Sequence, residues 1–336
     1  MALAACDRSA NSQPAAVAPL KSIAPCAVGT AIQSEQLRDP LLAALVLEHC
    51  SQLTAEWEMK MEYIVQPDGS FRFDGPDAIA GFARREGLRL FGHTLVWYNQ
   101  APPAFERLDE NRTSFADAYR AYITAVVGRY RGQAVGWDVV NEAVAEDGEG
   151  WRESLWASRL GDFEHMRLAF EIAHQADPAA VLFLNDYNLE YLPKKRVTFL
   201  RLVERLLKAG APLGGLGTQT HLAADQAPGE TRRAIRELAS VGLPVHVSEL
   251  DVSLARAGRL IPRGDLVRRQ AALYGEVAEA VAELPERQRF GLTLWGLRDK
   301  DSWLLRENAR DAPAPFDDQG MAKAAAGAMA RAWSGG

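Results

Sequence analysis

Residues 134–142 read Ala-Val-Gly-Trp-Asp-Val-Val-Asn-Glu, a mainly apolar run that ends in two polar side chains. The run does not alternate strictly between apolar and polar residues, which is typical of a parallel strand covered on both faces. Asn141 and Glu142 stand at its carboxyl end. The stretch therefore predicts a buried parallel strand that carries an amide and a carboxylate to one edge of a sheet.

Seven further runs have the same strand-like character, and they cover residues 26–32, 52–56, 88–95, 181–185, 215–220, 245–250 and 290–295. Helical patterns lie between them, the clearest being 163–176, 194–209, 266–284 and 321–333. Strand–helix alternation repeated eight times predicts a single (β/α)₈ TIM barrel of the α/β class. An open doubly wound sheet has the same local pattern, but no Gly-rich phosphate loop follows the first strand.

The composition is that of a globular protein with a large buried core. The chain has 336 residues, of which 48% are hydrophobic and 24% charged, and its net charge is −6. A negative net charge argues against a nucleic-acid partner, which would favour a basic face. No stretch is long and apolar enough to cross a bilayer. We expect a monomer.

The cysteine and histidine content indicates neither a metal site nor a cofactor. Cys6, Cys26 and Cys50 form no disulfide framework and no Cys-x-x-Cys motif. The six histidines are scattered singly, without the spacing of metal ligands. No metal and no cofactor are therefore expected.

The first residues allow two interpretations. Leu3-Ala-Ala-Cys6 resembles the lipobox of bacterial lipoprotein signals, and residues 7–20 are rich in Ser, Asn, Pro and Ala, as in a tether. Only five residues precede Cys6, however, too few for a basic and an apolar signal region. Residues 1–22 are thus expected to be a disordered tail or the remnant of a signal with a lipid anchor at Cys6, and residues 23–336 one catalytic domain. The expected location is secreted, periplasmic or lipoprotein-anchored in a bacterium.

Two strand ends carry glutamates that suit glycosidic cleavage. In a barrel, Glu142 on the fourth strand and Glu249 on the seventh emerge at the same rim, on opposite sides of the central pocket. Cleavage of a glycosidic bond needs one carboxyl group as acid and another as nucleophile or base. Asn141 can bond a sugar 2-hydroxyl, and His221, supported by Asp251, can hold Glu249 ionised. Each residue alone is unconvincing, but together they predict a glycosidase.

Six motifs then occur in the order of a known family, and they are Gly92-His-Thr-Leu-Val-Trp97, Trp137-Asp-Val-Val-Asn-Glu142, Asn185-Asp-Tyr-Asn188, Thr218-Gln-Thr-His221, Ser248-Glu-Leu-Asp-Val252 and Thr293-Leu-Trp-Gly296. From about residue 28 to residue 333 the chain resembles glycoside hydrolase family 10, the endo-β-1,4-xylanases. The resemblance implies a retaining, endo-acting enzyme that cuts xylan or xylo-oligosaccharides. Glu142 would be its acid/base and Glu249 its nucleophile.

The resemblance also implies a set of substrate-binding residues. Those around the attacked sugar would be Lys60, His93, Trp97, Asn141, Gln219, His221 and Trp295. Glu56 and Gln100 would reach the next sugar on the non-reducing side, and Trp303 would help to cover the cleft. Tyr187 fits either substrate contact or core packing, whereas core packing is preferred for Trp137.

Two residues depart from the family pattern near one end of the cleft. Residues 56–61 read Glu-Trp-Glu-Met-Lys-Met, so that Trp57 replaces the usual asparagine, and Tyr98 replaces a histidine. The added aromatic bulk predicts altered recognition of the glycone side. Two alternatives remain open: a retaining barrel glycosidase for another β-linked glycan, and a non-catalytic glycan-binding relative. The intact set of Glu142, Glu249 and their neighbours argues against the second.

Overall fold

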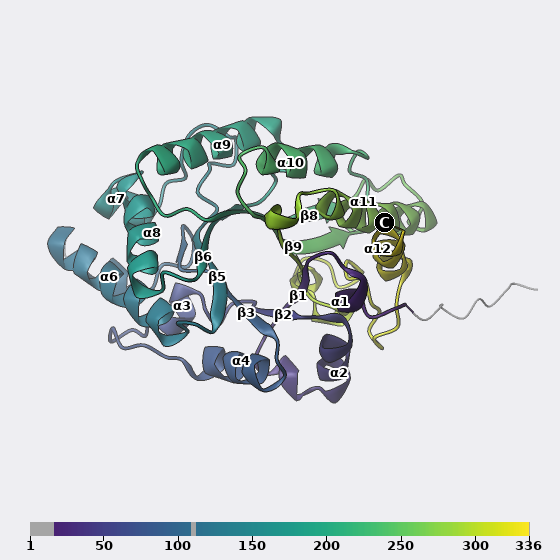
Figure 1. Cartoon of the computed structure of the whole chain (residues 1–336), viewed down its shortest axis with the longest axis horizontal. Helices are drawn as coiled ribbons and strands as arrows, with labels where there is room; N and C mark the ends of the chain where they lie inside the picture. The colour runs from purple at the N-terminus through teal and green to yellow at the C-terminus, as the bar shows by residue number, and fades with distance from the viewer. Residues whose placement is uncertain (1–16, 109–111, 336) are drawn as a thin grey trace, which may run out of the picture.

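The computed structural model describes residues 17–108 and 112–335, which fold into a closed barrel surrounded by helices (Figure 1). The parallel strands that form the barrel are β1 Ala27–Ile32, β2 Gln52–Ala55, β3 Arg89–Gly92, β5 Ala134–Asn141, β6 Val181–Asp186, β7 Gly215–Thr218, β9 Val245–Ser253 and β10 Arg289–Leu294. β10 pairs with both β9 and β1, which closes the sheet on itself. The prediction of a (β/α)₈ barrel is confirmed.

Two short strands extend the barrel at its carboxyl rim. β4, Val96–Trp97, pairs with the end of β5, and β8, His221–Ala223, pairs with the end of β9. The run predicted as one strand over residues 88–95 is therefore interrupted after Gly92, and pairing resumes at Val96. These extensions place Trp97 beside the end of β5, which leads into Glu142, and His221 beside β9, which carries Glu249.

Helices cover the outside of the barrel (Figure 1). They are α1 Leu20–Ile23, α2 Pro40–His49, α3 Met61–Ile64, α4 Asp74–Arg85, α5 Pro103–Glu106, α6 Arg112–Arg129, α7 Leu155–Leu160, α8 Glu164–Ala176, α9 Pro193–Lys208, α10 Glu230–Ala239, α11 Arg263–Ala282 and α12 Ala324–Ser334. Short 3₁₀ turns occupy Gln36–Arg38, Glu286–Gln288, Asp299–Asp301 and Trp303–Arg306. A helix on the surface of a globular protein buries its apolar face. In α9, for example, Leu202, Val203 and Leu206 recur at helical spacing and are fully buried.

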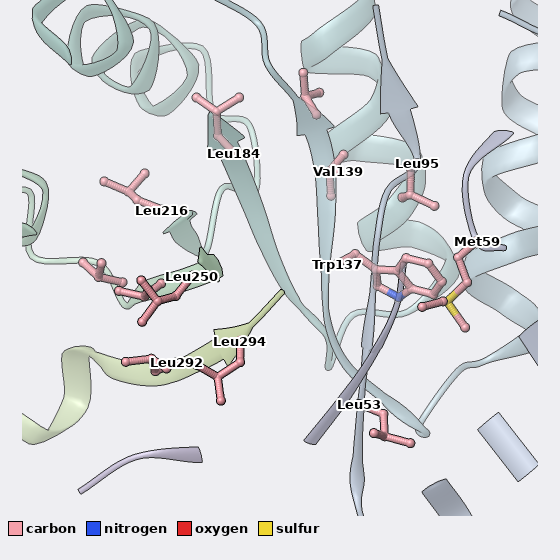
Figure 2. Packing of buried hydrophobic residues seen from close by; sticks show 14 of the residues in the cluster. Leu53, Met59, Leu95, Trp137, Val139, Leu184, Leu216, Leu250, Leu292 and Leu294 are labelled. Atoms are coloured by element: carbon pink, nitrogen blue, oxygen red, sulfur yellow. The ribbon is translucent and has the colours of Figure 1, made fainter. Parts of the chain in front are cut away.

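The barrel interior is apolar and aromatic beneath the polar strand ends. Phe91, Phe183 and Phe290 surround His246, with ring centroids 4.5–5.8 Å from the imidazole. Figure 2 shows a separate group of buried residues, to which Phe91 and Phe183 do not belong, with leucines such as Leu216 on the strands of the barrel. Large side chains thus fill the barrel toward the amino ends of the strands, and the polar groups of the candidate site lie at the carboxyl ends.

The boundary expected between the tail and the folded domain is wrong by a few residues. Leu20, assigned above to the tail, is fully buried in the hydrophobic core and begins α1. Its backbone N–H donates to Nδ1 of His49, 3.3 Å away. A segment of a single turn, Leu-Lys-Ser-Ile, is too short to show a helical periodicity, so the sequence did not reveal it. Cys6 lies outside the described residues, and its lipid anchor stays a prediction.

Among the residues that the structure covers, no helix is both long and apolar enough to span a bilayer. Over the same residues, no group of three or more His, Cys, Asp or Glu side chains is arranged to hold a metal ion. Trp137, assigned to the core from its position early in its strand, is fully buried.

Candidate active site

A cleft of about 720 Å³ lies at the carboxyl ends of the strands. The predicted site residues that line it are Glu56, Trp57, Lys60, Trp97, Tyr98, Gln100, Glu142, Tyr187, Gln219, His221, Glu249, Trp295 and Trp303. The structure places the other three, His93, Asn141 and Asp251, in buried positions against this set. Lining residues absent from the prediction are Asn99, Asn188, Tyr191, Arg256 and Arg306.

Glu142 follows the last residue of β5 in a conformation that is rare for a residue with a side chain. Its φ is +60°, in the left-handed region, and its backbone N–H donates to the carbonyl of Asn185 at 2.8 Å. Its carboxylate Oε1 accepts from Gln219 Nε2 at 2.9 Å and from Asn141 Nδ2 at 3.2 Å. The turn aims this carboxyl group into the cleft, and two amides fix it there.

Glu249 is a buried carboxylate in the middle of β9. Its Oε1 accepts from Asn185 Nδ2 at 3.0 Å, and its Oε2 lies 3.2 Å from His221 Nε2. Burial raises its pKa, but His93, His221 and Lys60 together outweigh burial and hold the pKa below its ordinary value. Glu249 is therefore ionised at neutral pH.

His221 links Glu249 to a second carboxylate. Its Nδ1 lies 2.9 Å from Oδ2 of Asp251, which also accepts from Trp303 Nε1 at 2.9 Å. Burial lowers the pKa of His221, but Asp251 and Glu249 outweigh it and raise the pKa to about 10. The imidazole is thus a cation that is shared between two carboxylates.

A pair of amides connects the two glutamates. Asn185 Nδ2, at the end of β6, donates to Asn141 Oδ1 at 2.9 Å as well as to Glu249. Asn185 Oδ1 in turn accepts from Ser248 Oγ at 2.8 Å. Asn185 is not among the predicted site residues, although its position at a strand end was the same signal that singled out Asn141. The bridge keeps both carboxyl groups in one fixed frame.

One wall of the cleft combines a cation with aromatic rings. Lys60 Nζ lies 4.6 Å from the ring centre of Trp97, and His93 meets the ring of Trp295 edge-on at 5.2 Å. Asp138, which the prediction did not include, lies 2.8 Å from His93 Nδ1, and burial raises its pKa to about 6. Such a wall suits sugar rings, whose C–H faces pack on aromatic side chains while their hydroxyls meet polar groups.

The two residues that depart from the family pattern both line the cleft. Trp57 is 40% exposed and packs edge-on against Tyr63 at a centroid distance of 4.8 Å. Tyr98 is stacked under the guanidinium of Arg152, whose central carbon lies 4.2 Å from the ring centre. Burial raises the pKa of Tyr98. Both side chains therefore add aromatic surface to the cleft wall.

Tyr187, for which two roles were open, lines the cleft and is also held from behind. Lys195 Nζ lies 3.5 Å from its ring centre, and the hydroxyl is hydrogen-bonded to Arg152 at 2.8 Å and to Glu146. Lys195 forms a fully buried ion pair with Asp186 at 2.9 Å. The ammonium group of Lys195 thus holds one face of the Tyr187 ring by a cation–π contact.

Comparison with known proteins agrees with this geometry. The family model of glycosyl hydrolase family 10 matches residues 20–332. An endo-1,4-beta-xylanase of Geobacillus stearothermophilus is 36% identical over 82% of this chain and 87% of its own length. A xylanase structure from Cellvibrio japonicus superimposes with a TM-score of 0.87 at 30% identity, covering 94% of this chain and 100% of the other. A match of this extent shows that the chain belongs to glycosyl hydrolase family 10.

Proposed function

We propose that the chain is a retaining endo-1,4-β-xylanase with Glu142 as acid/base and Glu249 as nucleophile. The observation that carries the proposal is the cationic His221, which holds Glu249 ionised while neutral amides hold Glu142. A nucleophile must be charged, whereas a general acid must be able to carry a proton. The curated xylanases of Geobacillus stearothermophilus and Claviceps purpurea, 36% and 32% identical, support xylan as the polymer.

In the proposed reaction the carboxylate of Glu249 attacks the anomeric carbon while Glu142 gives its proton to the leaving oxygen. The glycosidic C–O bond breaks, and a glycosyl ester on Glu249 remains. Glu142, now a carboxylate, takes a proton from water, whose oxygen displaces Glu249 and retains the anomeric configuration. Structures of a Thermoanaerobacterium saccharolyticum xylanase, solved as two different glutamate-to-alanine mutants, hold xylotetraose and xylotriose.

The assignment is tested by trapping the ester. A 2-fluoro xylobioside with a good leaving group should inactivate the enzyme and add one glycosyl mass to the peptide that contains Glu249. Nuclear magnetic resonance of freshly cleaved xylotetraose should show the β-anomer first. Labelling of another peptide, or an α-anomer as the first product, would contradict the assigned mechanism.

We further propose that Trp57 changes how the glycone side recognises the substrate. Its half-exposed indole stands among the lining residues together with Glu56 and Lys60, at a position where the family pattern has a short amide. The substitution Trp57→Asn, which removes the indole ring, should change which glycosidic bond of xylotetraose, xylopentaose and xylohexaose is cut, compared with the wild type. Identical products and rates for the two enzymes would remove this proposal and leave the xylanase assignment untouched.

A second candidate activity is cleavage of another β-linked glycan. One relative, 32% identical over 90% of this chain but matched over only 28% of its own length, is an exoglucanase of Acetivibrio thermocellus. Rates on aryl β-xylobioside and aryl β-cellobioside decide between the two. A higher kcat/KM on the cellobioside would favour the glucan.

A further inference from the structure

Arg152, in the loop between β5 and α7, contacts both the acid/base and the cleft wall. Its Nε donates to the backbone carbonyl of Glu142 at 3.2 Å, and its guanidinium lies on the face of Tyr98 at 4.2 Å. Its Nη2 donates to Tyr187 Oη at 2.8 Å and lies 3.3 Å from Glu146 Oε2. The side chain is only 15% exposed. One cation thus ties together residues from three separate segments.

These contacts act on a residue whose backbone is in a rare conformation. Glu142 has a φ of +60°, so its backbone needs support from its neighbours to keep this orientation. The carbonyl of Asn185 holds its N–H, and Arg152 holds its C=O. Loss of either contact would let the residue rotate, which would carry its carboxyl group away from the leaving oxygen.

The two tyrosines extend this support into the cleft wall. Tyr98 and Tyr187 both line the cleft beside Glu142, and Arg152 contacts both rings. A planar guanidinium can stack on one ring while it donates in its own plane to other groups, and an ammonium cannot do both. A histidine at position 98 could become a second cation next to Arg152, whereas Tyr98, with its raised pKa, stays neutral.

We propose that Arg152 is a positioning residue for proton transfer. It holds the backbone carbonyl of Glu142 and fixes the side chains of Tyr98 and Tyr187, which both line the cleft. The carboxyl group of Glu142 is thereby kept where it meets the leaving oxygen. The proposal rests on the proposed function and goes beyond it. It assigns Arg152 no contact with the reacting atoms. Its effect should therefore depend on how much protonation the leaving group requires.

The experiment compares kcat/KM for two substrates with leaving groups of different basicity. Xylotetraose has a sugar alkoxide leaving group that needs a proton, whereas 2,4-dinitrophenyl β-xylobioside departs almost without one. Arg152→Gln should lower kcat/KM on xylotetraose by roughly 10- to 100-fold, within the range of general acid catalysis. On the dinitrophenyl substrate we expect a fall of no more than about threefold, because that step does not use the acid.

Two further variants and a control make the result decisive. Arg152→Lys should show the same selective loss, and Tyr187→Phe, which keeps the ring but removes Oη, a smaller loss of the same kind. Arg167→Gln, which breaks ion pairs to Glu164 and Glu171 on the surface of α8, should change neither rate.

The melting temperature of each variant separates folding from positioning. If Arg152→Gln does not fold, Tyr187→Phe alone decides by its own ratio of losses. Equal losses on both substrates, or no loss, in a folded variant would overturn the proposal. Failure of the wild type to cleave either β-xyloside would instead refute the proposed function.

Discussion

His221 is the residue on which the charge distribution of the site depends. It lies between Glu249 and Asp251, and its pKa, raised to about 10 by these carboxylates, keeps it cationic at neutral pH. The groups that lower the pKa of Glu249 are His93, His221 and Lys60, and His221 is the one in direct contact. The nucleophile therefore owes much of its ionised state to this imidazole.

Replacing His221 with asparagine should move the acidic limb of the pH–activity profile to higher pH. In the wild type the pKa of Glu249 is lowered, so the nucleophile stays charged even when the pH falls below the pKa of an ordinary glutamate. Without the imidazolium that pKa rises, so activity is lost earlier on acidification. A lost charge-assisted hydrogen bond should also reduce kcat/KM by about 10- to 100-fold at neutral pH. The profile is measured on an aryl β-xylobioside, and an unmoved acidic limb would contradict this account.

How far single residues can be predicted from the sequence depends on what they contact. Glu142 and Glu249 stand beside the ends of the strands that the sequence predicts over 134–141 and 245–250, so their common rim follows from the barrel alone. Asp138 and Arg152 are different, because their partners lie 45 and 35 positions away in the chain. Pairings of that kind are created by the fold, and no local pattern marks them.

The eight strands of the barrel were predicted in number and order, but the short strands β4 and β8 and the irregularities were not. The third strand was expected as one run, yet pairing stops at Gly92 and resumes at β4. β9 runs to Ser253, past the predicted end at residue 250, because β8 offers it a further partner. Such extensions depend on a neighbouring strand, and hydrophobic pattern alone cannot show where that neighbour ends.

Gly217 in β7 shows how close packing between strands sets the site. A Cβ at this position would lie 2.3 Å from Oδ1 of Asn185, the amide that bridges the two glutamates. Gly217→Ala should therefore displace Asn185, lower kcat/KM by at least tenfold, and reduce the free energy of unfolding by about 1–3 kcal/mol, as overpacked cores do.

Gly128→Ala is the matched control, since a Cβ there meets nothing within 4 Å and the residue lies in α6. It should leave activity unchanged and keep or slightly raise stability. Kinetics on xylotetraose and urea unfolding measure both variants. Full activity in Gly217→Ala would show that catalysis does not depend on the observed position of the Asn185 side chain.

Closure of the barrel brings together the first and the last units of the fold. β1 pairs with β10, and α1 packs against both α2 and α12 (Figure 1). Arg298, after β10, forms ion pairs with Asp39 before α2 at 2.8 Å and with Asp301 at 2.6 Å. The last unit of the barrel is therefore fixed onto the first by backbone pairing, apolar contact and charge.

Substitution of Leu20 tests whether α1 contributes to the stability of the closed barrel. Its side chain is fully buried, so Leu20→Ala should lower the free energy of unfolding by about 2–5 kcal/mol, through lost burial and the cavity left behind. Leu260, 99% exposed, offers the same substitution at the surface, where a change within about 0.5 kcal/mol is expected. Urea unfolding measures both, and kcat/KM at 25 °C should stay at the wild-type value because neither leucine lines the cleft. If the two substitutions had equally small effects on unfolding, the barrel would close without its first turn, and the folded domain would begin at β1.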